Sequence, residues 1–190
     1  ITMISTAHSP RLAARFGQNT FVIRSETPLA EDQMRRAAPS IFAEGKHGSR
    51  SERYTYIPTI DVLRGLRHEG FEPFMVAQSK SRIEGKTEFT KHMIRMRHAG
   101  QVNTRPEANE IILINSHDGA SSYQMLAGVF RFVCCNGLVV GDVTNDIRIP
   151  HLCVALDYAK RRCQAVARPG ATRGHWSGRS LPIVKDLART

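Results

Sequence analysis

The chain has 190 residues, 41% of them hydrophobic, which is enough for one domain with a real core and too little for two. No apolar run approaches the roughly 18 to 20 residues of a membrane span, and the N-terminus lacks a basic region followed by an apolar stretch and a cleavage site. Membrane insertion and secretion are therefore not expected, and a formal net charge of +10 indicates an anionic partner.

Two helices are predicted in the first half of the chain. Thr27-Pro28, followed by acidic residues, marks a helix start, and the helix is expected to continue to about Phe42. A second helix is predicted from Ile60 to Glu69, with Thr59 as its cap and Gly70 in the left-handed position that ends it. The mostly apolar face of the first helix consists of Leu29, Met34, Ala37, Ala38 and Ile41.

Three segments then show the period of two that is typical of strands: Tyr54 to Ile57, Phe71 to Gln78, and Lys91 to Arg97. In the third, alternation separates the side chains into two faces. One face holds Lys91, Met93, Arg95 and Arg97, and the other holds His92, Ile94 and Met96. The cationic face is either an ordinary solvated surface or a track for phosphates, whereas a hydrogen-bonded core position is expected for His92.

Further strands are predicted in the second half. Glu110 to Asn115 is a compact apolar run that indicates a central, buried strand, and Ser116 to Gly119 has the composition of a turn. Tyr123 to Cys135 fits a strand or a helix by periodicity, and its aromatic and β-branched residues favour a strand. The segments predicted to follow are a hairpin at Asn136-Gly137, a returning strand at Leu138 to Val140, and a short strand from Asp146 to Ile149.

The positive charge is concentrated near the C-terminus. From His151 to Thr190 there are eight Lys or Arg and two Asp, in a stretch rich in Gly, Ser and Pro. A flexible, basic extension is therefore expected over residues 152–190. Two roles are open for it: non-specific, salt-sensitive binding of nucleic acid, or none beyond being a solvated chain end. For residues 11–151 the predicted fold class is α+β, a single domain with a mainly antiparallel sheet and two or three helices.

Four blocks of the sequence resemble a known family. The blocks are KHGSRSERYTYIPT (Lys46 to Thr59), FTKHMIRMR (Phe89 to Arg97), EIILINSHDGASSYQML (Glu110 to Leu126) and FRFVCCNGLVVGD (Phe130 to Asp142). In this order they are similar to domain of unknown function 932, the phage/plasmid-like family of YfjQ- and YafZ-like prophage proteins, over about residues 11–151. The resemblance implies an accessory protein of mobile elements but no established activity. After His151 the chain is expected to be an unrelated extension or the product of a shifted reading frame.

Nucleic-acid binding is the leading expectation for the matched positions. Cations beside aromatic rings suit contact with phosphates and bases, although an internally paired loop uses the same residue types. The candidate nucleic-acid-binding residues are Lys46, His47, Arg50, Arg53, Tyr54, Tyr56, Lys91, Arg95 and Arg97. Single-stranded DNA in recombination or repair is the more specific expectation. The alternative is a protein-binding factor that counters or regulates a host system.

A His/Asp-dependent hydrolase is the second alternative. His117 and Asp118 follow a buried strand, where sites are often built, but Asp and Gly equally well make the turn. Such a centre requires His47 or Glu52 to approach them. No GxxxxGK, HExxH, GxSxG or CxxC motif is present, and the cysteines at 134, 135, 153 and 163 do not match a zinc framework. The sequence therefore favours a reduced, cytoplasmic, non-enzymatic protein with no cofactor and no metal, of undetermined oligomeric state.

Overall fold

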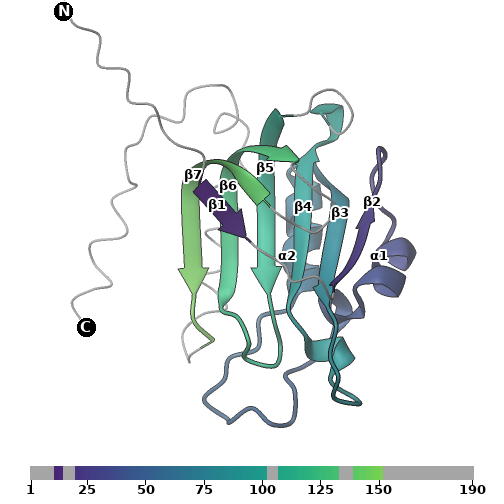
Figure 1. The fold of residues 1–190 in the computed structure, drawn as a ribbon, viewed down its shortest axis with the longest axis vertical. Coiled ribbons are helices and arrows are strands. Elements are labelled where there is room, and N and C mark those ends of the chain that lie inside the picture. The colour runs from purple at the N-terminus through teal and green to yellow at the C-terminus, as the bar shows by residue number, and fades with distance from the viewer. Residues whose placement is uncertain (1–10, 15–19, 102–106, 133–138, 152–190) are drawn as a thin grey trace, which may run out of the picture.

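The computed structural model describes residues 11–14, 20–101, 107–132 and 139–151. In this part of the chain seven strands form one antiparallel sheet in the order β1-β7-β6-β5-β4-β3-β2 (Figure 1). The strands are β1 (Arg11–Ala14), β2 (Thr20–Arg24), β3 (Phe71–Ser79), β4 (His92–His98), β5 (Glu107–Asn115), β6 (Tyr123–Phe132) and β7 (Val139–Ile149). The helices are α1 (Glu31–Ala37) and α2 (Thr59–His68), with 3₁₀ turns η1 (Pro39–Phe42), η2 (Thr87–Phe89) and η3 (Ala99–Gln101). The predicted α+β class is confirmed.

The sheet is strongly curled. Its edge strands β1 and β2 have five strands between them, which would separate them by about 29 Å in a flat sheet with a strand spacing of about 4.8 Å. Six Cα-to-Cα steps from Ala14 to Thr20 span at most about 22 Å. The sheet therefore has to curl until its edges approach, and in Figure 1 β1 crosses in front of its neighbours.

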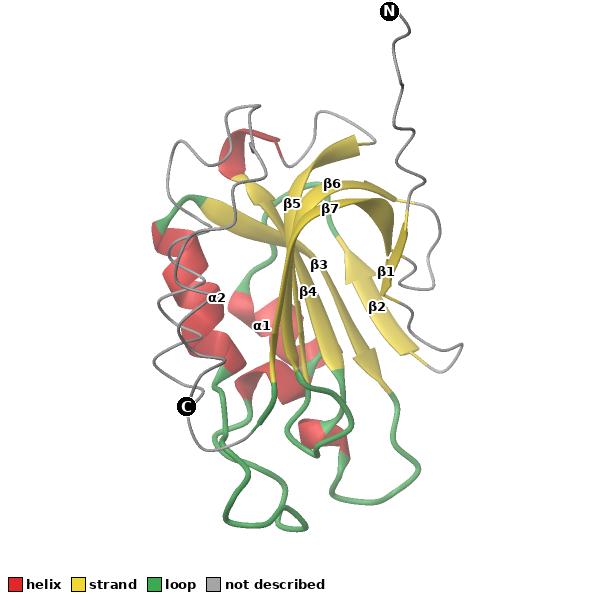
Figure 2. Cartoon of the chain, turned by 90° about the vertical axis from the view of Figure 1, so that its left-hand side faces the viewer, coloured by secondary structure: helices red, strands yellow, loops and turns green. Residues whose placement is uncertain are grey.

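The outer face of the curl packs against the helices, which lie on the same side of the sheet in Figure 2. The helical side of this core includes Leu29, Met34, Ala38, Ile41, Val62, Leu63 and Leu66, and the sheet side includes Ile94, Met96, Ile111, Leu113 and Met125. Burying each large apolar side chain stabilises the fold by about 1.5–3 kcal/mol relative to exposure. The apolar face predicted for the first helix is thus the one that is buried. None of the helices in the described residues is long and apolar enough to span a bilayer.

The inner face, on the opposite side of the sheet, has a core of its own. Its apolar residues are Phe74, Met75, Ala77, Met93, Ile112, Ile114, Leu126 and Phe130. Because both faces of β3, β4 and β5 are covered, these strands are nearly continuous in burial rather than alternating. The prediction that Glu110 to Asn115 forms a central, buried strand is confirmed.

The structure corrects the prediction that β4 presents cations on a solvated or phosphate-contacting face. Arg95 is 0% exposed and Arg97 is 2% exposed, because both side chains project into the inner core. Arg95 Nη2 lies 2.6 Å from Glu110 Oε2, and Arg97 Nη2 lies 2.7 Å from Glu110 Oε1. The guanidinium carbons also lie 5.4 and 4.5 Å from the centroid of the Phe74 ring. These arginines hold neighbouring strands together inside the protein.

The first helix begins later than predicted, at Glu31 with Ala30 as its N-cap rather than at Thr27-Pro28, and it also ends earlier. It stops at Ala37, and the chain continues as the separate turn η1 to Phe42. Pro39 has no amide hydrogen and disfavours helical geometry at the residue before it, and Ala38 accordingly has φ −144° and ψ 68°. The second helix spans Thr59–His68, close to its predicted bounds, and Gly70 has the expected positive φ of 86°.

Three strand predictions are also corrected. The segment Tyr54 to Ile57 forms a loop with only one bridge residue, since its tyrosines bond outside the segment. The two short strands predicted near Leu138 and Asp146 belong to one strand, β7, whose pairing with β6 shifts register between Ala127 and Gly128. The strands β1 and β2 were not predicted. The hairpin at Asn136-Gly137, all four cysteines and the extension 152–190 lie outside the described residues.

Candidate functional site at the loop end of the sheet

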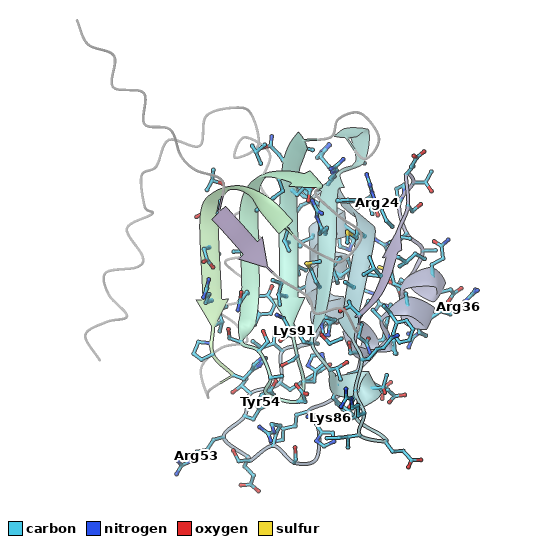
Figure 3. The ribbon with its side chains drawn as sticks, viewed as in Figure 1. Arg24, Arg36, Arg53, Tyr54, Lys86 and Lys91 are labelled. Atoms are coloured by element: carbon cyan, nitrogen blue, oxygen red, sulfur yellow. The ribbon has the colours of Figure 1, made fainter. Side chains whose placement is uncertain are left out.

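Four segments that are distant in sequence meet at one end of the sheet. This loop end consists of residues 43–58, 80–91, 115–122 and His151. His47 N donates to His117 O at 2.9 Å, His117 N donates to Phe89 O at 2.9 Å, and Thr55 N donates to His151 O at 3.1 Å. In Figure 3, Tyr54, Lys86 and Lys91 gather at this end, and Arg53 points away from it. The sequence candidates placed here are Lys46, His47, Arg50, Arg53, Tyr54, Tyr56, Lys91, His117 and Asp118.

A chain of hydrogen bonds fixes the protonation of His92. Asn115 Nδ2 donates to Thr59 Oγ1 at 3.0 Å, and Thr59 Oγ1 lies 2.9 Å from His92 Nε2. Ser40 Oγ lies 2.9 Å from His92 Nδ1 and donates to Gln78 Oε1 at 2.7 Å. Since the Ser40 proton is used on Gln78, His92 donates through Nδ1 and accepts at Nε2. Burial lowers the pKa of His92 well below its usual value, so this core histidine is neutral, as expected.

The same chain corrects the predicted role of Thr59. Its hydroxyl bonds to His92, and α2 has no side-chain cap; the residue before the helix is Pro58. The partners Ser40, Gln78 and Asn115 were not singled out in the sequence. Each is an isolated polar residue in an apolar surrounding, a weak signal that becomes informative only once the fold is known.

His117 lies beside His92 but makes no comparable bonds. It is 0% exposed, and its ring centroid lies 5.2 Å from that of His92 and 4.9 Å from that of Tyr56. Within the described residues neither ring nitrogen has a hydrogen-bond partner. Burial lowers the pKa of His117 to about 4, and the nearby Ser40 backbone opposes this shift. His117 is therefore neutral at pH 7.

His151 closes the cluster from the end of β7. Its Nδ1 lies 2.9 Å from the Thr55 carbonyl oxygen, and its ring stacks on Tyr54 at a centroid distance of 4.5 Å. A carbonyl only accepts, so Nδ1 carries the proton and Nε2 has the lone pair. Nε2 is buried and without a hydrogen-bond partner in the described part of the chain. Burial lowers the pKa of His151, against the carbonyls of Thr55 and Ser121.

The two tyrosines hold the loop in place. Tyr54 Oη donates to the Ser116 carbonyl at 2.7 Å, and Tyr56 Oη donates to the Ala43 carbonyl. Burial raises the pKa of Tyr54, and it raises that of Tyr56 to about 12, so both hydroxyls stay protonated. Because their rings pack on His151 and His117, these partly buried tyrosines also hold the interior of the loop end together.

Asp118 and His47 do not complete a hydrolytic centre with His117. The Asp118 carboxylate pairs with Lys86 at 3.1 Å and accepts from Ala120 N at 2.9 Å. Gly119 has φ +77°, so Asp118 and Gly119 build the turn, one of the two roles foreseen for them. His47 approaches His117 through its backbone, but its ring bonds to Ser49 Oγ at 2.8 Å.

The cations of the loop differ from those of the helical face. Lys46 Nζ donates to the Ser51 carbonyl at 2.9 Å, Arg50 donates to Ser49 Oγ, and Arg53 is exposed. Within the described residues no carboxylate lies within ion-pair distance of these three side chains. On the helical face, by contrast, Arg64 pairs with Glu31 and Arg67 pairs with Glu72. Lys91, also at the loop end, is half-buried, and this burial lowers its pKa.

These features define an α+β domain whose curled antiparallel sheet carries, at its loop end, a buried histidine cluster beneath a rim of cations. The chain belongs to the family described as domain of unknown function (DUF932), whose profile matches residues 46–168. The predicted resemblance is thereby confirmed. The match extends past His151, where the resemblance was expected to stop, so the expectation of an unrelated extension directly after His151 is wrong.

The chain is also similar to two proteins of Escherichia coli (strain K12). It is 55% identical over 141 residues to UPF0380 protein YafZ and 54% identical over 141 residues to UPF0380 protein YfjQ. Each alignment covers 74% of this chain and 51% of the relative, so the chain spans about half the length of these curated relatives. No solved structure matches the chain.

Proposed function

We propose that the chain is a cytoplasmic accessory protein of prophages or plasmids that binds nucleic acid, single-stranded DNA in particular, through the cations of its loop end. The observation that supports this most is the set Lys46, Arg50 and Arg53. These residues lie within one surface loop and lack carboxylate partners among the described residues. Cations that are not used in internal ion pairs remain available for phosphates.

The loop that carries these cations is held in one conformation. The bonds from His47 N to His117 O and from Tyr54 Oη to Ser116 O fasten it at both ends to the turn after β5. A fixed loop loses little conformational entropy on binding, which favours a modest set of phosphate contacts.

The charge balance limits how strong this binding is. The described residues contain 17 Lys or Arg and 15 Asp or Glu, so the domain has little excess positive charge outside the loop. If three side chains each neutralise one phosphate of a single strand, log K falls with log salt by a slope of about 2. Residues 152–190 add a separate basic contribution that an experiment has to distinguish from that of the loop.

The test is fluorescence anisotropy of labelled single-stranded and duplex oligonucleotides with the full chain between about 50 and 200 mM salt. The triple variant Lys46→Gln/Arg50→Gln/Arg53→Gln should weaken binding and lower the salt slope by about 2. The control, Arg36→Gln/Arg64→Gln/Arg148→Gln, removes the same charge from exposed positions elsewhere. Equal losses in both variants would refute a loop-end site, and no binding by either chain would favour a host protein as partner.

A further inference from the structure

Among the side chains that the structure describes, one aromatic ring is largely exposed. Phe21 is 52% exposed, whereas the rings of Tyr54 and Tyr56 are partly buried against histidines. The other large hydrophobic side chains that stay exposed in this part of the chain, Ile83 and Val129, have no ring. We propose that Phe21 stacks on one unpaired base of a single-stranded nucleic acid, an inference that rests on the proposed function.

Phe21 lies at the loop end of the sheet. It is the second residue of β2, an edge strand (Figure 1), and Thr20 before it pairs with Ser79, the last residue of β3. Ser79 N in turn donates to Lys91 O at 2.8 Å, which closes the base of the loop that joins β3 to β4. The ring therefore lies beside residues 80–91, one of the segments that form the loop end.

A cation accompanies the ring. Lys80 Nζ lies 4.5 Å from the centroid of the Phe21 ring. Lys80 is exposed, and no carboxylate of the described residues lies within ion-pair distance of it. Residues 80–91 contain four Lys or Arg and two Glu, so the loop as a whole is positive. A base that stacks on the ring brings its own phosphate close to this ammonium, and single-strand binding combines rings and cations in this way.

Contacts join this loop to the cations of the proposed function. Lys86, from the loop beside the ring, pairs with Asp118 at 3.1 Å. A Cβ on the next residue, Gly119, would lie 2.8 Å from Arg50 Nη1, so the Arg50 side chain extends across the same turn. The cations of both loops therefore gather around one turn, and a single strand bound there can extend along the loop end to Phe21.

The ring gives the site a preference for unpaired bases. In a duplex each base is stacked on its neighbours, so no base face is open to a protein ring, whereas the phosphates stay accessible in both forms. Stacking on Phe21 thus adds affinity for single strands alone, and the cations bind either form. The ring does not select a particular base, because every base has a π-face.

The test is fluorescence anisotropy of the full chain with two single strands of about 12 positions, one of thymidines and one of abasic sugars that keeps only the phosphates. Phe21→Ala should weaken binding of the thymidine strand about five- to tenfold, the lower part of the range for losing one stacking side chain, and leave the abasic strand unaffected. Phe21→Trp should keep wild-type affinity, and Phe21→Leu should behave like Phe21→Ala. Lys80→Gln should lower the salt slope by about 0.7 on both strands. The matched control is Ile83→Ala, which removes an exposed apolar side chain of the neighbouring loop and should change neither affinity.

An equal effect of Phe21→Ala on both strands would overturn the stacking site, and so would wild-type affinity of Phe21→Leu for the thymidine strand. If the wild-type chain binds both strands and Phe21→Ala changes neither, the stacking site fails while the proposed function stands. A wild-type chain that binds neither strand overturns both. Should Phe21→Ala not fold, the comparison of Phe21→Leu with Phe21→Trp on the two strands decides the question.

Discussion

Replacing Glu110 by glutamine should destabilise the domain by about 3–5 kcal/mol, the usual cost of removing one partner from a buried ion pair. Glu110 accepts hydrogen bonds from Arg95 Nε at 2.7 Å and from Arg97 Nε and Nη2 at 2.9 and 2.7 Å. Glutamine keeps the shape of the side chain but removes a negative charge from between two buried guanidiniums. The loss is large because water does not reach these cations to replace the carboxylate.

Urea unfolding followed by circular dichroism measures this difference, and Glu72→Gln is the control. Glu72 bonds Arg67 Nε at 3.1 Å, but its side chain is 28% exposed, so its loss should cost no more than about 1 kcal/mol. Replacing all three buried charges, as in Arg95→Met/Glu110→Leu/Arg97→Leu, should be far less harmful than Glu110→Gln. Equal costs for Glu110→Gln and Glu72→Gln would refute the assignment of these arginines to the inner core.

Three further predictions concern the loop end and the sheet. Folding lowers the pKa of His117 from 6.5 to about 4. Between pH 6.5 and pH 4 the unfolded state therefore binds more protons than the folded state, and the free energy of unfolding decreases as the pH falls. Unfolding at pH 5 should require about 2 kcal/mol less than at pH 7 on account of His117, and His117→Gln should remove this share. Asn115→Ala should lower the free energy of unfolding in urea by about 1–3 kcal/mol, because the Ile57 carbonyl and the Thr59 hydroxyl each lose the hydrogen bond donated by Asn115 Nδ2. An unchanged midpoint of the urea transition would contradict this hydrogen-bond chain. Gly141→Ala should lower the melting temperature, because its Cβ would collide with the Val129 carbonyl on β6, and a wild-type melting curve would contradict the described β6–β7 pairing.

Local patterns predicted the elements whose signals are local. The apolar run from Glu110 to Asn115 identified a buried strand, and apolar spacing with Gly70 located α2. The break in the first helix was also predictable, since Pro39 is visible in the sequence and proline interrupts helical hydrogen bonding.

The environment of the inner face was not predictable in this way. Alternation correctly placed Arg95 and Arg97 on one face of a strand, but it does not tell whether that face is covered. Whether the inner face is covered depends on the curl of the sheet. The curl follows from the short connection between β1 and β2, which are the two edges of a sheet whose strands come from the whole chain. Glu110, the partner that makes their burial possible, is apparent only from the register of β4 with β5.

The histidine cluster shows the same limit for a site. His117 was a sequence candidate because it follows a buried strand, but it was paired with its neighbour Asp118. In the structure Asp118 pairs with Lys86 instead, and β7 brings His151 to the same loop end through its pairing with β6. No motif or spacing marks His151 in the sequence, so only the strand register could have identified it.

Ultraviolet cross-linking of a single-stranded oligonucleotide to the full chain, followed by mass spectrometry of the linked peptides, tests nucleic-acid binding at the loop end most directly. Cross-links are expected within residues 46–54, and they should disappear in Lys46→Gln/Arg50→Gln/Arg53→Gln. Cross-links confined to residues 152–190, unaffected by these substitutions, would contradict binding at the loop end.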